Sequence, residues 1–204
     1  MKLWGYLQVI QTLVKNTTVR YWVLEKILTQ SVSQLEQLLQ LLKGTEGAWV
    51  NTARRMSHWH QRIHEMLPGS KNIKVYVGDK LWGLACSSIH FLDLIDWWAG
   101  EKLVSINTSK LSSEWFASKR PGFYEVMGRL TASYSGGSEI IMESKNENGM
   151  LNIHIEAKDG SWIINEANGI AKGPGGVVIH GRIEHQSELT ARLVSSILNT
   201  GSCD

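Results

Sequence analysis

Two basic side chains, far apart in the sequence, are the residues best suited to carry out chemistry. Lys26 follows an apolar run at residues 19–24, and His90 lies in a segment with helical spacing. A neutral imidazole is a suitable base near pH 7 for removing a proton from a hydroxyl group. A lysine cation can stabilise negative charge on a nearby oxygen. Both side chains are therefore candidates for a functional site, provided that the fold exposes them to a ligand.

A polar and basic cluster follows the next apolar run of the sequence. Asn51, Arg54 and Arg55 come directly after the run at residues 48–50. The carboxyl ends of neighbouring parallel strands meet at one edge of a sheet, where α/β proteins bind ligands. We therefore predict that this cluster lies at the same sheet edge as Lys26.

Hydrophobic periodicity predicts the elements that must position these residues. The predicted helices are 3–14, 32–42, 57–67, 87–99 and 184–198. The predicted strands are 19–24, 48–50, 73–77, 103–108, 126–134, 139–143, 151–156 and 162–165. Ser31 has the type and position of a helix N-cap, and Pro68-Gly69 ends the third helix. The opening is β–α–β, which implies parallel strands, whereas the alternation after residue 103 predicts a largely antiparallel sheet with one apolar face.

The composition excludes several classes of protein. The 204 residues carry 21 Lys and Arg against 19 Asp and Glu, so the net charge is +2. That balance argues against a nucleic-acid partner, because such proteins carry a clearly basic surface. The longest apolar run is shorter than the roughly 18 residues of a membrane span, and the start at Met1-Lys2 lacks a signal-peptide cleavage site. We therefore expect a cytoplasmic protein with no membrane partner.

The order of the motifs resembles a known enzyme family. The motifs are Glu25-Lys26 after a strand, Asn51-x-x-Arg54-Arg55 after the next strand, and Ile89-His90-x-x-Asp93 behind a glycine-bearing loop. Followed by an open sheet, this order is similar to that of the Gfo/Idh/MocA oxidoreductases, which are NAD(P)-dependent and act mostly on sugars, sugar nucleotides and cyclitols. The resemblance extends from about Val19 to the C-terminal helix.

The resemblance implies an α+β fold in two parts. Residues 1–55 would be a remnant of the dinucleotide-binding Rossmann domain, with a partial βαβ unit. Residues 56–204 would be the substrate-binding and oligomerisation domain, with an open, mostly antiparallel sheet and helices on one face. It further implies NAD or NADP as cofactor, a sugar or sugar-nucleotide substrate, and a homo-oligomer formed through the open sheet face.

The resemblance also assigns roles to individual residues. Lys26 and His90 would be catalytic, and Glu25 and Lys26 would contact the cofactor. The residues implied to contact substrate are Asn51, Arg54, Arg55 and Cys86. Trp82 joins them because an indole can stack on a sugar ring, although packing in the core is the commoner explanation for such a residue. Two positions depart from the family pattern: Ile27 replaces a proline, and Cys86 replaces an aspartate that would orient the histidine.

The dinucleotide fingerprint of such enzymes is missing from this sequence. No Gly-x-Gly-x-x-Gly pattern precedes Lys26, and the segment 173–176, Gly-Pro-Gly-Gly, lacks its spacing. We therefore expect a chain without most of its nucleotide-binding half, which binds NAD(P) poorly by itself.

Two other interpretations of the sequence remain open. One is a non-catalytic sugar-binding or assembly module that keeps the pocket and the sheet. The other is a metal site formed by His58, His60 and His64, although a solvated helix face is the simpler explanation for these three residues.

Overall fold

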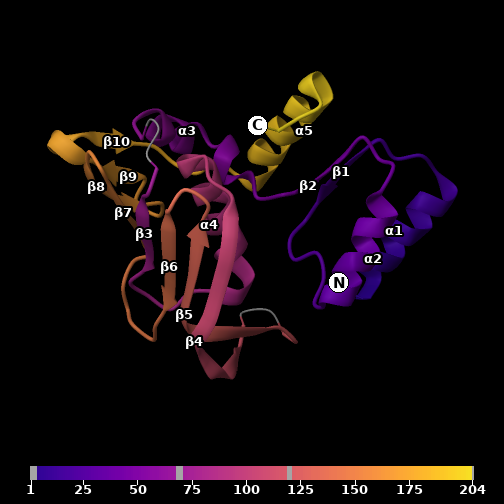
Figure 1. Ribbon diagram of the computed structural model, residues 1–204, viewed down its shortest axis with the longest axis horizontal. Helices are drawn as coiled ribbons and strands as arrows, with labels where there is room; N and C mark the ends of the chain where they lie inside the picture. The colour runs from indigo at the N-terminus through magenta and orange to yellow at the C-terminus, as the bar shows by residue number, and fades with distance from the viewer. Residues whose placement is uncertain (1–3, 68–70, 119–120, 204) are drawn as a thin grey trace. The chain divides into compact units, whose positions relative to one another are not determined.

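The computed structural model describes the backbone of residues 4–67, 71–118 and 121–203 (Figure 1). The chain forms two compact units, Met1–Ala53 with His185–Asp204, and Arg54–Glu184. Among the helices described, none has the length and apolar character needed to cross a membrane. The predicted helix start at residue 3 and the predicted stop at Pro68-Gly69 lie outside the described residues.

The first unit is built on two short parallel strands. Its elements are α1 (Trp4–Asn16), β1 (Tyr21–Leu24), α2 (Val32–Leu42), β2 (Gly47–Val50) and α5 (Gln186–Thr200). Strands β1 and β2 pair in parallel, which confirms the predicted β–α–β opening. The core of this unit combines side chains of α1, β1 and α2, namely Ile10, Trp22, Leu24 and Leu38. Helices α1 and α2 therefore cover one face of the two-stranded sheet (Figure 1).

The second unit contains a large sheet with helices on one face. Its helices are α3 (His58–Glu65) and α4 (Leu84–Ala99). Its strands are β3 (Lys74–Gly78), β4 (Leu103–Ala117), β5 (Tyr124–Tyr134), β6 (Glu139–Ser144), β7 (Asn152–Ala157), β8 (Gly160–Asn165), β9 (Ile170–Lys172) and β10 (Val178–His180). In the described residues the sheet has the order β10-β9-β8-β7-β3-β6-β5-β4, and neighbours are antiparallel except for β3 and β6. The predicted open, mostly antiparallel sheet is thus confirmed.

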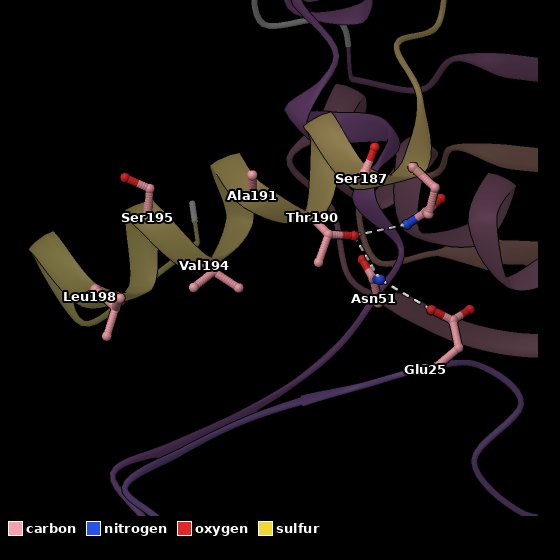
Figure 2. A pocket seen from close by; sticks show the side chains of 9 residues that line it. Glu25, Asn51, Ser187, Thr190, Ala191, Val194, Ser195 and Leu198 are labelled. Carbon is pink, nitrogen blue, oxygen red and sulfur yellow. Dashed lines mark hydrogen bonds between the residues drawn. The ribbon is translucent and has the colours of Figure 1, made fainter.

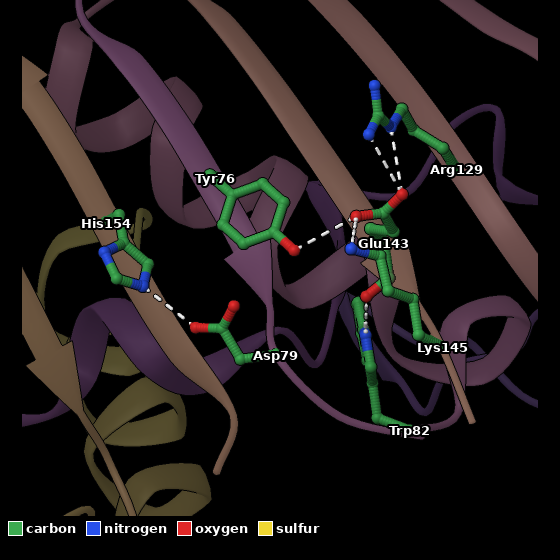
Figure 3. A network of polar contacts seen from close by, with 7 residues as sticks. All are labelled: Tyr76, Asp79, Trp82, Arg129, Glu143, Lys145 and His154. Carbon is green, nitrogen blue, oxygen red and sulfur yellow. Dashed lines mark hydrogen bonds and ion pairs between the residues drawn. The ribbon is translucent and has the colours of Figure 1, made fainter. Parts of the chain in front are cut away.

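The two faces of this sheet differ in chemistry. One face is apolar and packs with α4 in the buried core. Its side chains include every second residue of β3 and β6, namely Val75, Val77, Ile140 and Met142. The other face carries polar side chains centred on Glu143 (Figure 3). The residues in contact with its carboxylate are Tyr76 at 3.1 Å, Arg129 at 3.0 Å and Lys145 at 2.8 Å. Burial alone would raise the pKa of Glu143, but the hydrogen bonds from these neighbours outweigh it and lower that pKa. The open face is therefore more polar than the sequence suggested.

Helix α4 begins earlier than the sequence indicates. It starts at Leu84 rather than residue 87, so His90 lies in the second turn and not the first. The buried Glu125 carboxylate accepts a hydrogen bond of 2.9 Å from the backbone N–H of Ala85 and so caps the helix from a distant strand. Gly83 leaves room for it, because a Cβ there would come within 2.7 Å of Glu125 Oε1. Such a remote cap leaves no local sequence signal.

Helix α3 is capped in a similar way. Its N-cap residue, Ser57, makes no side-chain cap of its own and instead donates to Glu184 Oε2 at 2.7 Å. Glu184 Oε1 accepts the backbone N–H of His58 at 3.1 Å. Both helices that pack on the sheet therefore begin at a carboxylate supplied from elsewhere in the chain, which suits the positive end of a helix dipole.

Other element bounds also differ from those predicted. Strand β4 extends to Ala117 instead of residue 108, and the short strands β9 and β10 flank the turn at Pro174–Gly176, where only a loop was predicted. Strands of three residues carry too little alternation to be recognised in a sequence.

We expect Glu125→Ala to lower the free energy of unfolding by about 1–2 kcal/mol, because it removes the cap of α4. Glu125→Gln should lower the free energy of unfolding by less, because its amide oxygen still accepts the Ala85 N–H although it lacks the negative charge. Urea denaturation followed by tryptophan fluorescence measures both. Glu114→Ala, at an exposed glutamate on β4, is the control. An equal loss in the Glu125→Ala and Glu114→Ala variants would contradict the capping role.

Candidate functional site

Two polar residues meet at the carboxyl ends of the parallel strands. Glu25 directly follows β1 and Asn51 directly follows β2. Asn51 Nδ2 donates to Glu25 Oε2 at 3.1 Å and to Thr190 Oγ1 at 3.1 Å (Figure 2). Asn51 is only 6% exposed, so its amide is held firmly between strand and helix. The structure thus brings together two of the predicted site residues and adds Thr190, which is 139 positions away in the sequence.

An open groove of about 680 Å³ runs from this contact along α5 (Figure 2). Its lining residues are Glu25, Asn51, Gln186, Ser187, Thr190, Ala191, Val194, Ser195 and Leu198. Gln186 Nε2 lies 3.3 Å from Thr190 Oγ1 at the polar end, whereas Val194 and Leu198 make the other end apolar. A carboxylate and an amide beside an apolar strip suit a ligand with hydroxyl or amide groups on a ring. Nothing in the sequence indicated that α5 would contribute to this site.

The two residues predicted to be catalytic belong to different units. Lys26 is half-buried directly after Glu25, and its peptide bond to Ile27 is cis. His90 is half-buried in the second turn of α4. The pairing of Lys26 with His90 links the two units and stays a prediction.

Arg54 is held by an ion pair in the second unit. Its Nε and Nη2 lie 2.9 Å and 3.0 Å from the two carboxylate oxygens of Glu166, and its guanidinium lies 4.6 Å from the centre of the Phe91 ring. The fully buried His60 contacts the same carboxylate at 3.0 Å. Burial alone would raise the pKa of Glu166, but Arg54 and His60 outweigh it and hold that pKa well below its usual range.

Arg55 is also held by an ion pair, with a residue of α4. It forms an ion pair with Asp93, in which Nε lies 3.2 Å from Oδ2. Arg54 therefore contacts Phe91, which directly follows His90, and Arg55 contacts Asp93, three positions after His90. The two arginines tie α4 to the turn that precedes α3. Their contact with substrate stays a prediction.

The remaining predicted substrate residues also lie in or next to α4. Trp82 is buried, donates from Nε1 to the backbone oxygen of Glu143 at 2.7 Å and packs edge-on against Phe91. Cys86 is half-buried one turn before His90. Contact of Trp82 and Cys86 with a substrate stays a prediction too.

The three histidines that suggested a metal site have separate neighbours. His60 contacts Glu166, His58 Nδ1 lies 3.3 Å from Gln61 Oε1, and His64 packs against the Trp97 ring at 4.1 Å. Burial lowers the pKa of His64. In the described ranges no three His, Cys, Asp or Glu side chains are grouped so as to hold a metal ion.

Comparison with known proteins shows the fold. Neither a scan against known protein families nor a search of characterised sequences gives a match. Solved structures do match. A super-repressor mutant of Gal80p from Saccharomyces cerevisiae is 14% identical, with a TM-score of 0.72 over 98% of this chain and 66% of that one. UDP-N-acetylglucosamine 3-dehydrogenase from Acidithiobacillus ferrooxidans is 11% identical, with a TM-score of 0.67 over 98% of this chain and 66% of that one.

An oxidoreductase from Agrobacterium radiobacter, solved in complex with NAD+, L-tartaric acid and magnesium, is also similar. It is 11% identical, with a TM-score of 0.67 over 99% of this chain and 69% of that one. The chain therefore has the fold of the Gfo/Idh/MocA-type oxidoreductases, as its motifs suggested. It spans about two thirds of the length of these structures.

We expect Asn51→Asp to destabilise the first unit by about 1–2 kcal/mol at pH 7, because it places a second carboxylate beside Glu25. Like charges raise the pKa of one member of such a pair, so the lost stability returns when that member is protonated. The difference from wild type should therefore be smaller at pH 4 than at pH 7. Urea denaturation at both pH values measures it. Asn51→Ala is the control, and an equal pH dependence in both variants would contradict the arrangement.

We expect Glu166→Gln to lower the free energy of unfolding by about 2–4 kcal/mol near pH 7, because it leaves the Arg54 guanidinium without its carboxylate partner. The folded pKa of Glu166 is lowered from an ordinary 4.5, so its stabilisation is complete above that value and is lost as the pH falls toward the folded pKa. The stability difference between wild type and variant should shrink on acidification. Glu65→Gln, at an exposed glutamate of α3, is the control, and thermal unfolding from pH 7 to pH 3 measures all three proteins.

Proposed function

We propose that the chain is the substrate-side part of an NAD(P)-dependent oxidoreductase, which transfers a hydride at a secondary hydroxyl or ketone of a sugar or sugar nucleotide. The observation that carries the proposal is the contact between Asn51 and Glu25, directly beside Lys26, at the carboxyl ends of two parallel strands. That edge is where α/β sheets bind their ligands. The fold over nearly the whole chain supports the same proposal.

Lys26 and His90 would divide the chemistry between them. In the oxidative direction His90 takes the proton of the substrate hydroxyl, and the Lys26 ammonium stabilises the negative charge left on that oxygen. The carbon–oxygen double bond forms as the carbon loses its hydride. When bound, NAD(P) supplies the nicotinamide ring that accepts this hydride. Glu25 and Asn51 offer hydrogen bonds to hydroxyl or amide groups at the same edge.

The residues of this chain fit one end of a dinucleotide better than the other. The polar end of the groove suits a carboxamide or ribose group. The phosphates, however, need a glycine-rich turn at the start of a helix, and the sequence has no such fingerprint. We propose that residues outside these 204 hold the phosphates.

We also propose how copies of the protein associate and where the protein is located. The sheet face opposite α4, with the polar network around Glu143, is the surface through which two copies would associate. The location would be cytoplasmic, which rests on the sequence alone.

A second candidate is a non-catalytic sugar-binding or assembly module. The super-repressor mutant of Gal80p shares the fold with a higher TM-score than the two enzymes quoted above. Cys86 and Ile27 also replace an aspartate and a proline of the family pattern. Both candidates keep the sugar pocket, so sugar binding does not distinguish them, and only a test for catalysis does.

We expect UDP-N-acetylglucosamine to quench the tryptophan fluorescence of the chain without any cofactor, because both candidates keep the pocket. NADH alone should give no saturable binding in calorimetry up to about 1 mM. Micromolar NADH affinity with turnover by this chain alone would refute the proposed deficiency.

The catalytic roles need the complete enzyme. If the DNA directly upstream encodes an in-frame Gly-x-Gly-x-x-Gly segment, we expect the longer product to oxidise a sugar nucleotide with NAD+ or NADP+. In that product His90→Ala should lower kcat by about 10²–10⁴-fold. Sugar binding that survives His90→Ala, with no reaction under any condition, would favour the non-catalytic module.

A further inference from the structure

The sequence contains two Asn-Gly pairs, Asn148-Gly149 and Asn168-Gly169. An asparagine that precedes a glycine is prone to react with its own backbone, because glycine has no Cβ to hinder the approach of the asparagine side chain to the next backbone nitrogen. Both pairs lie in loops between strands of the large sheet, the first between β6 and β7 and the second between β8 and β9. The surroundings of the two pairs differ, and they determine which pair can react in the folded protein.

Asn148 lies in an irregular, exposed loop at residues 145–151. The loop is anchored just before it, where the backbone oxygen of Glu147 accepts the N–H of Leu81 at 3.4 Å. In the part of the chain that the structure describes, no hydrogen bond involves Asn148 or the N–H of Gly149, and both residues are exposed. The Asn148 side chain can therefore turn toward the next backbone nitrogen without breaking a hydrogen bond.

Asn168, in contrast, is held in place. Its backbone N–H donates to Asn165 Oδ1 at 2.8 Å, and its Nδ2 lies 3.3 Å from Met150 Sδ. Gly169 is buried, and its backbone oxygen accepts the N–H of Gly181 at 3.0 Å. A Cβ at Gly169 would come within 1.9 Å of the Gly181 oxygen, so this turn is tightly packed. Reaction at Asn168 therefore requires local unfolding of the turn between β8 and β9.

We propose that Asn148-Gly149 is a site of spontaneous deamidation in the folded protein. The backbone nitrogen of Gly149 attacks the side-chain carbonyl carbon of Asn148. The bond from that carbon to the amide nitrogen breaks, and ammonia leaves with the proton of the backbone N–H. Water then opens the cyclic imide at either carbonyl, which yields aspartate or isoaspartate. No atom is oxidised or reduced, and water is the one co-reactant.

The isoaspartate product does not fit the present contacts of this loop. It adds a methylene to the backbone before Gly149 and leaves a new carboxylate. Gly149 packs so closely on Asp79 that a Cβ at Gly149 would come within 1.8 Å of the Asp79 backbone oxygen. The Asp79 carboxylate is itself held by His154 Nε2 at 2.9 Å (Figure 3). We expect the modification to disturb these contacts and to loosen the loop that leads from β3 to α4.

Ageing of the purified full chain tests the inference, with Asn168 as the matched control in the same molecule. The protein is kept at neutral pH, either folded or unfolded in guanidinium chloride, and sampled over several weeks. Cleavage by trypsin at Lys158 separates the two pairs, and mass spectrometry detects deamidation as a mass increase of about 1 Da. In the folded protein we expect Asn148 to react about ten-fold faster than Asn168, whereas in denaturant the two rates should agree within about two-fold.

The Asn148→Gln variant separates this modification from other effects of ageing. A glutamine needs a larger ring to cyclise, so the exposed position should stay unmodified. After ageing, the midpoint of thermal unfolding should be constant in the variant and about 2–4 °C lower in wild type that carries isoaspartate in the peptide 146–158.

Two results would overturn the inference. One is equal deamidation of Asn148 and Asn168 in the folded protein. The other is a rate at Asn148 that is about ten-fold lower in the folded than in the unfolded chain, because the fold would then protect this pair as well. A midpoint that stays constant while isoaspartate accumulates would overturn the proposed disturbance of the Asp79 loop.

Discussion

The parallel pairing of β1 with β2 is the constraint on which the candidate site depends. Because both strands run in the same direction, Glu25 and Asn51 emerge at the same sheet edge and share a hydrogen bond. An antiparallel pair would place them at opposite edges. The same bond network extends through Thr190 to α5, so the C-terminal helix belongs to a site that begins near the N-terminus.

In the second unit, carboxylates hold the helices and the two arginines in place. Glu125 and Glu184 accept backbone N–H groups at the starts of α4 and α3, and Glu166 and Asp93 pair with the arginines that follow β2. A buried carboxylate with several donors favours one arrangement strongly, because any other arrangement leaves the charge without partners. His90 is therefore carried by a helix that is fixed at its start by Glu125 and along its length by the Asp93–Arg55 ion pair and the contact of Arg54 with the Phe91 ring.

The features of the fold that depend on local sequence pattern could be predicted. The β–α–β opening, the Ser31 cap of α2 and the alternation of the large sheet were predictable, because periodicity and capping act over a few residues. Sequence reasoning missed Glu125, Glu166 and Thr190, because each acts on a partner that only the tertiary fold brings near. Asn51 was predicted to lie at the same sheet edge as Lys26 for a physical reason, the geometry of parallel strands, whereas Glu25 was named only through the family resemblance. For Lys26 and His90 the sequence offers only the family resemblance, which places no atoms.

The fold is shared by dehydrogenases and by a repressor, so the fold alone does not decide between the two kinds of function, and the proposed role of His90 depends on its neighbours. The family pattern has an aspartate one turn before the histidine, and here Cys86 supplies a thiol at that position. Asp93, one turn after His90, does not replace that aspartate, because its carboxylate is already paired with Arg55. An imidazole that acts as a base gains strength from a carboxylate that is not neutralised by another cation. For the proposed reaction, a thiol at position 86 and an Asp93 already paired with Arg55 would give less electrostatic support for proton removal than the aspartate of the family pattern.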